Sequence, residues 1–168
     1  MNSLSFPSVP STLAPGLRRA AAASLVLIGM LLAGSTAQAS DASVQRALKA
    51  YETRLAADIG YLSSFTAPTT RGAPAALRRL ATVQTDLNGA TTAANSHQAS
   101  TRSGRTGRTE VLSALHHASL AATEAQRCGK ATRAGHHADA RRDAKAEQGE
   151  INEAIPLFEA GGKRLHLF

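Results

Sequence analysis

The residues best suited to metal chemistry are six histidines, two pairs of which are adjacent: His97, His116, His117, His136, His137 and His166. Adjacent histidines on a helix point about 100° apart. Two histidines that chelate one ion from a single helix are separated by four positions, and no pair in this sequence has that spacing. Histidines at helix ends, in contact with solvent, are therefore the favoured interpretation.

A mixed set of donors is the alternative for metal binding. His136, Asp139 and Asp143 are spaced to share one face of a helix, and Cys128 lies across a predicted turn from them. Imidazole, carboxylate and thiolate groups are all zinc ligands. These four residues are the candidate metal site, and no other cofactor is predicted.

The second candidate site is a set of arginines suited to binding polyanions, namely Arg71, Arg78, Arg79, Arg102, Arg105 and Arg108. The planar guanidinium group makes paired hydrogen bonds to phosphate and carboxylate oxygens. An acidic envelope polymer or a lipid surface is the partner that this chemistry indicates. Nucleic acid is not expected, because the segment has no aromatic residue to stack on bases. A solvated basic helix face is the simpler explanation of the same pattern.

No motif for catalysis is present. The sequence lacks G-x-S-x-G, a glycine-rich phosphate loop and H-E-x-x-H, so we expect no enzymatic activity. Four glutamates near the C-terminus predict one solvated acidic helix face: Glu147, Glu150, Glu153 and Glu159.

The N-terminal segment 1–39 has the pattern of a secretory signal peptide. Arg18 and Arg19 precede an apolar run over 20–34, and the sequence Ala37-Gln38-Ala39 predicts cleavage before Ser40. The run is shorter than the roughly 20 apolar residues that span a bilayer, although an uncleaved anchoring helix remains the alternative. The arginine pair leaves both general and twin-arginine export open. The predicted location is secreted, periplasmic or elsewhere in the cell envelope.

Export affects the interpretation of Cys128, the single cysteine. An unpaired cysteine in an oxidising compartment indicates a free thiol or an intermolecular bridge, here a disulfide-linked homodimer. A small residue buried in an alanine-rich helix is the alternative, and it is slightly favoured. The oligomeric state is left open.

Residues 40–168 are predicted to form a single alanine-rich helical domain. Removal of Arg18 and Arg19 lowers the formal net charge from +7 to about +5. Apolar residues recur three and four positions apart, which is the helical period. Asp41 is expected to cap the first helix, and Pro74 to lie in the first turn of the second. Glycines and arginines without apolar residues predict a loop over 100–109, and Pro156 predicts a kink or an end. The expected helices are 41 to before 68, 74 to about 100, from Thr106 or Thr109 to about 128, and 137–155.

Bulky residues at the end of one expected helix lie opposite alanines of the next, so that large and small side chains are matched. The sequence therefore predicts an all-α fold, a four-helix up-down bundle, with two loosely packed helical hairpins as the alternative. The function that it indicates is a secreted or envelope protein acting as a non-catalytic interaction or structural module. A ligand-binding module for a metal ion or an acidic polymer is the alternative.

Overall fold

The computed structural model describes residues 41–167, which contain α-helices and no strands. The predicted all-helical class is confirmed. The helices are α2 (Asp41–Lys49), α3 (Glu52–Ser63), α4 (Ala73–Asn95), α5 (Arg102–Arg133) and α6 (His137–Arg164). Within this range no helix is both long and apolar enough to cross a bilayer. The predicted signal peptide, with Ala37, Ala39 and Ser40 at its cleavage site, lies outside the described residues.

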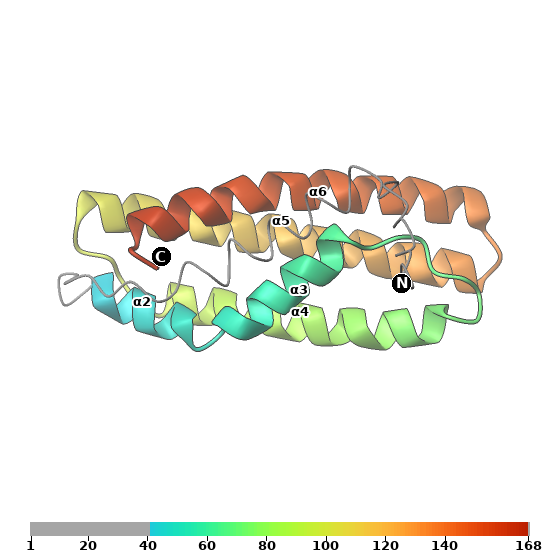
Figure 1. Cartoon of the computed structure of the whole chain (residues 1–168), viewed down its shortest axis with the longest axis horizontal. Helices are drawn as coiled ribbons and strands as arrows, with labels where there is room; N and C mark the ends of the chain where they lie inside the picture. The colour runs from blue at the N-terminus through green and yellow to red at the C-terminus, as the bar shows by residue number, and fades with distance from the viewer. Residues whose placement is uncertain (1–40, 168) are drawn as a thin grey trace, which may run out of the picture.

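The long helices α4, α5 and α6 run along the length of the molecule, each antiparallel to the one before it (Figure 1). The consecutive helices α2 and α3 pack against the three long helices. Helix α2 contacts α4, and α3 contacts α4, α5 and α6. One end of the molecule therefore gathers the starts of α4 and α6 with the end of α5. The opposite end gathers the starts of α2 and α5 with the ends of α4 and α6.

The apolar stripes predicted from the helical period form the core. The bulky members that are completely buried include Val44, Leu62, Leu80, Leu87, Leu115 and Ile151. In α5 the stripe continues in buried alanines, which leave room for a neighbouring helix to approach closely. Leu77 shows this matching of large and small residues, because its Cδ2 lies 3.0 Å from where a Cβ on Gly129 would be.

The first predicted helix is interrupted at Ala50 and Tyr51, a break that the sequence analysis did not predict. Tyr51 packs against α4 at Gly89, where an added Cβ would lie 2.7 Å from a tyrosine ring carbon. The guanidinium of Arg54 covers the same ring at 4.7 Å from its centre. The missing side chain at Gly89 thus admits the ring, and Gly89 itself lies inside the continuous helix α4.

The loop predicted over 100–109 is wrong, because α5 begins at Arg102. Thr101 is the N-cap, with its side chain accepting a hydrogen bond from the Gly104 amide at 2.8 Å. The glycines that suggested a loop are helical contact points instead. A Cβ on Gly107 would lie 2.9 Å from the Gly161 carbonyl oxygen of α6.

The helix end expected at Ile155, before Pro156, is also wrong, because α6 continues through Pro156 to Arg164. The backbone carbonyl that Pro156 deprives of a donor belongs to Asn152, and both residues are exposed, so water can replace the lost bond. Gly161 is buried against Val111 and Gly107 of α5. The absence of a side chain at Gly161 allows α6 to pack closely against α5, and this packing stabilises α6 at the glycine.

The C-terminal segment folds back onto the core. Leu165 is completely buried and Leu167 packs against the core cluster. The Gln45 side chain donates a hydrogen bond to the His166 carbonyl oxygen at 2.5 Å, which ties this segment to α2. Phe168 lies outside the described residues.

Candidate functional site

One end of the molecule carries six exposed basic side chains, and we call this surface the basic end: Arg71, Arg78, Lys130, Arg133, Arg141 and Lys145. Two lie beside or in the start of α4, two in the last turn of α5 and two in the first turns of α6. None of the six forms an ion pair with any residue of the range 41–167.

Packing of the three helix ends brings these charges to the same end of the molecule. The contact between Leu77 and Gly129 sets the start of α4 beside the end of α5, so Arg78 and Lys130 lie within about one turn of each other along the helix axes. A tight turn then reverses the chain, with Gly135 at φ 79° and the His136 amide donating to the Ala131 carbonyl at 2.8 Å. Positive φ favours glycine at this position. The turn holds the start of α6 beside the end of α5.

Acidic side chains near the basic end are already paired with other arginines. Asp58 contacts Arg79 at 2.6 Å, Glu124 contacts Arg127 at 2.6 Å, and Asp139 and Asp143 contact Arg142 at 3.2 and 3.3 Å. Within the described chain, these pairs leave the six charges of the basic end without a counter-charge in contact.

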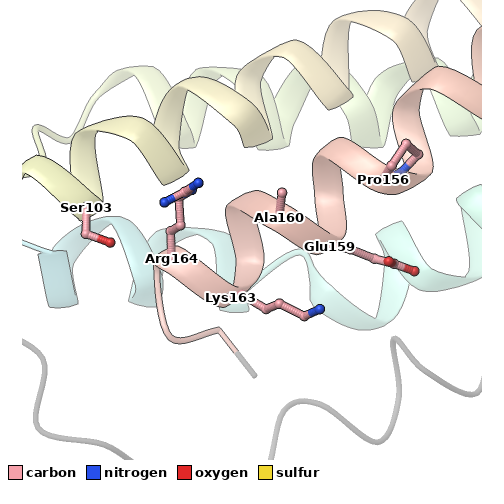
Figure 2. A pocket seen from close by; sticks show the side chains of 6 residues that line it. All are labelled: Ser103, Pro156, Glu159, Ala160, Lys163 and Arg164. Carbon is pink, nitrogen blue, oxygen red and sulfur yellow. The ribbon is translucent and has the colours of Figure 1, made fainter.

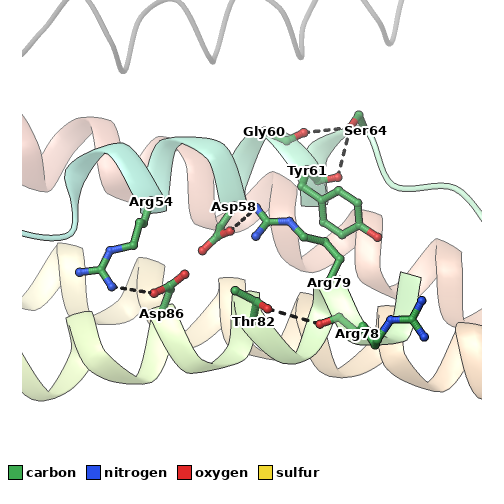
Figure 3. Close-up of polar contacts among 9 residues, drawn as sticks. All are labelled: Arg54, Asp58, Gly60, Tyr61, Ser64, Arg78, Arg79, Thr82 and Asp86. Atoms are coloured by element: carbon green, nitrogen blue, oxygen red, sulfur yellow. Dashed lines mark hydrogen bonds and ion pairs between the residues drawn. The ribbon is translucent and has the colours of Figure 1, made fainter. Parts of the chain in front are cut away.

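The arginines predicted to bind polyanions do not form one site. Arg71, Arg78 and Arg79 lie at the start of α4, whereas Arg102, Arg105 and Arg108 lie beyond its other end. Arg108 bonds to the Ala94 carbonyl, 15 residues beyond Arg79 along α4, so the two groups are at least roughly 20 Å apart. Figure 3 shows that neighbours differ too, because Arg79 reaches across to Asp58 while Arg78 points away from α3.

We call the opposite surface the capped end, and it comprises Asp41, Arg105, Arg108 and Arg164. Arg105 and Arg108 donate hydrogen bonds to backbone carbonyls there. Arg108 donates to the carbonyl oxygens of Ala94 at 2.8 Å and Asn95 at 3.3 Å, where α4 ends and its last carbonyls lack helical partners. Arg105 donates to the Ser100 carbonyl, and Arg164 pairs with Glu110 at 3.0 Å.

Asp41 holds the start of α5 at the capped end. Its carboxylate accepts hydrogen bonds from the Ser100 amide at 2.8 Å and the Thr101 hydroxyl at 2.5 Å. Burial raises the pKa of Asp41, but these hydrogen bonds outweigh it and leave the pKa below its ordinary value. The sequence predicted that Asp41 caps its own helix; the structure shows its carboxylate bonded to Ser100 and Thr101, the two residues before α5, of which Thr101 is the N-cap.

Burial divides the charges of the described residues unequally. Every lysine and arginine in this range is exposed except the half-buried Arg79 and Arg108, whereas Glu153 is the one acidic side chain in the exposed class. Five acidic side chains are buried: Asp41, Asp58, Asp86, Asp143 and Glu147. The surface is therefore more basic than the composition alone indicates.

The prediction that Glu147 belongs to a solvated acidic face is wrong. Its side chain is completely buried, and neither carboxyl oxygen has a hydrogen-bond partner among the described residues. Burial raises the pKa of Glu147 to about 8, since a buried charge without a partner is costly. The group is mostly protonated at neutral pH.

Residues from the packed helices surround Glu147. Tyr61 of α3 and Cys128 of α5 both have a pKa raised by burial, and the nearby Glu147 carboxylate raises each further. The guanidinium of Arg79 lies over the Tyr61 ring at 5.5 Å and opposes the rise for Tyr61. Asp58 of α3 also has a raised pKa, because burial outweighs its ion pair with Arg79. Glu147, Cys128 and Asp58 are buried, whereas Tyr61 and Arg79 are half-buried and reach the surface.

The candidate metal ligands are not brought together. His136 is exposed, whereas Cys128 and Asp143 are buried and Asp139 pairs with Arg142. Across residues 41–167, no group of three or more histidine, cysteine or acidic side chains is arranged to hold a metal ion. Cys128 is completely buried, so the predicted disulfide-linked dimer requires the helices to open first.

A groove lies where the end of α6 passes the start of α5, at the capped end (Figure 2). It is lined by Ser103, Pro156, Glu159, Ala160, Lys163 and Arg164. Lys163 and Glu159 offer charges of opposite sign along one helix face, and Arg164 is engaged by Glu110. The lining shows no cluster of one charge, so the groove does not select a ligand class.

The adjacent histidines of α5 differ in their surroundings. His117 Nδ1 lies 2.8 Å from a Glu150 carboxyl oxygen of α6, while His116 is exposed. The contact joins two helix faces and leaves no free imidazole pair. His117 thus links α5 to α6, whereas His116 is exposed to solvent.

Comparison with protein-family models, curated proteins and solved structures yields no match for this chain. The site is therefore argued from its own residues. Sequence reasoning missed Lys130, Arg133, Arg141 and Lys145, although their spacings of three and four, on either side of the turn at Gly135, are a signal. Bases so spaced project from one end of a helical hairpin.

Proposed function

We propose that this protein is exported and acts in the cell envelope or outside the cell as a non-catalytic interaction module for an acidic partner. The observation that carries the proposal is the division of charge, with arginines and lysines exposed and five acidic side chains buried. A surface of this sign attracts anionic polymers and lipids and speeds their encounter. The signal-peptide pattern of residues 1–39 supports the location.

We further propose that the scaffold is a four-helix up-down bundle in which α2 and α3 together form the first helix. The antiparallel course of α4, α5 and α6 supports this architecture. A rigid bundle of this kind suits a binding role, because it holds charges at fixed positions without a cleft for chemistry.

Salt-dependent association tests the proposed function. The full chain is mixed with vesicles of phosphatidylcholine alone or with about 30% phosphatidylglycerol, and with soluble inorganic polyphosphate, at ionic strengths of about 0.05 and 0.5 M. We expect binding to the anionic probes that weakens as salt shortens the Debye length. Binding that is equal on neutral vesicles, or unchanged by salt, contradicts the proposal.

A further inference from the structure

We propose that the basic end is the docking surface of this protein and that it binds the phosphate groups of an anionic lipid bilayer end-on. The inference rests on the proposed function and specifies where the partner binds and what it is. It involves the six exposed bases of Arg71, Arg78, Lys130, Arg133, Arg141 and Lys145.

The six bases have no ion-pair partner within the described chain, a property that Lys49, Arg102 and Lys163 share, and the six are distinguished by coming from three neighbouring helix ends. Arg54, Arg79, Arg127 and Arg142 are held by carboxylates, and Arg108 by backbone carbonyls. A base with a partner must break that contact before it binds a phosphate, whereas the six bases have none to break within the described chain. Their full attraction is therefore available to an external anion.

Helix ends add to the charge at this surface. The helices α4 and α6 both begin here, and the aligned peptide dipoles give a helix start partial positive charge. The N-cap residues Gly72 and His136 form no side-chain cap hydrogen bond, although the first amides of α4 donate to the Thr69 and Gly72 carbonyls. The exposed His136 and His137 also gain positive charge when they are protonated.

The shape of the basic end favours a bilayer over a soluble ligand. Its charges come from three helix ends side by side, and the described groove lies at the opposite end of the molecule. A linear polymer or a small anion is best held in a channel or pocket, whereas a cluster at the end of a rod matches a plane of headgroups. The large apolar side chain that is exposed in the described range, Leu120, lies ten residues before Lys130 on α5. Attachment at the basic end therefore depends on charge and is reversible.

Charge-matched variants of the full chain test this inference. The basic-end variant is Lys130→Gln/Arg133→Gln/Arg141→Gln, and the control is Lys49→Gln/Arg102→Gln/Lys163→Gln, whose exposed bases also lack ion pairs in the described chain. Because each base near an anionic surface contributes about fivefold in partitioning, we expect the basic-end variant to bind vesicles with about 30% phosphatidylglycerol on the order of 100-fold more weakly. The control is expected to change by less than about fivefold, and circular dichroism checks that both fold.

The outcomes separate the two proposals. Equal losses in both variants overturn the docking surface but leave salt-dependent binding by the unsubstituted chain, and thus the proposed function, intact. Binding to polyphosphate with none to the anionic vesicles overturns the choice of a bilayer. Absence of binding to either anionic probe removes the proposed function together with the inference.

Discussion

Asp41 and Glu147 are both carboxyl groups buried by helix packing, yet Asp41 receives hydrogen bonds from Ser100 and Thr101 whereas Glu147 receives none. The pKa of Asp41 lies below its ordinary value, and that of Glu147 rises to about 8. Asp41 lies at the capped end, whereas Glu147 lies within α6, nearer to the basic end. At the capped end Asp41, Arg105 and Arg108 bond to backbone groups, whereas the six bases of the basic end have no counter-charge in contact within the described chain.

The difference has a structural cause. Helix termini expose amides and carbonyls that need partners, and the capped end uses Asp41, Arg105 and Arg108 to supply them. The basic end joins α5 and α6 by a tight turn that satisfies its own backbone groups. Its side chains are therefore not required for folding and remain available to a partner.

The largest expected effect concerns Glu147. Between its ordinary pKa of 4.5 and its folded value of about 8, the unfolded chain has lost this proton while the folded chain keeps it, so stability falls as pH rises through that window. The full fall is on the order of 5 kcal/mol. Glu147→Gln should remove most of this slope, as measured by urea unfolding at several pH values. An unchanged slope would show that Glu147 finds a partner in solution.

A large side chain at the glycine contact of the capped end is expected to be nearly as costly. Gly161→Val places a Cβ 2.7 Å from the Gly107 carbonyl oxygen, which forces α5 and α6 apart and lowers the free energy of unfolding by about 3 kcal/mol. Gly149→Ala is the matched control on the same helix, because nothing lies within 4 Å of its added Cβ. The control should stabilise α6 by about 0.5–1 kcal/mol in thermal unfolding. Equal effects of the two changes would rule out the close contact.

Removal of the Asp41 carboxylate tests the other buried acid. Asp41→Ala deprives the Ser100 amide and the Thr101 hydroxyl of their acceptor, at a cost of about 2 kcal/mol in denaturant unfolding near neutral pH. Because the folded pKa is lowered, the stabilisation is present above the ordinary value of 3.8 and is lost as pH falls through the folded pKa. The variant should therefore be less sensitive to acid than the natural chain. A cost that stays constant down to strong acid would contradict the charge-based cap.

The smallest expected effect is at the basic end itself. Lys130→Gln should change the free energy of unfolding by no more than about 0.5 kcal/mol, and in the stabilising direction, since it relieves repulsion among unpaired bases. The gain should disappear in high salt, which screens that repulsion. A loss of 1 kcal/mol or more in thermal unfolding would reveal a structural role for this lysine.

The sequence was sufficient to predict the helical class and most of the core. Apolar spacing identified the stripes of α2 to α5, and Pro74 marked the start of α4. The glycines Gly104 and Gly107 were misread, since a helical glycine and a loop glycine differ only in what lies across from them. Asp41 and Gly161 are the residues that lie there, and both are distant in sequence from their partners.

The basic end was not predicted because its members come from separate parts of the chain. Arg78 and Lys130 become neighbours only through the packing of Leu77 on Gly129. Which bases stay free also depends on pairs such as Asp58 with Arg79, which spacing along the chain does not reveal. The burial of Glu147 was missed for a similar reason, because α3 covers a helix face that appears solvated when α6 is considered by itself.

Chemical modification of Cys128 can measure how often the folded molecule opens. This residue is the one cysteine of the sequence, it is completely buried, and burial raises the pKa of its thiol, so a labelling reagent reacts only when the helices separate. The rate of modification by a maleimide under native conditions therefore reports how often the helices around Cys128 separate. In an oxidising compartment, the rate of helix separation also limits how fast a disulfide can form between the Cys128 residues of two chains. The rate of disulfide formation would then measure the lifetime of the folded state.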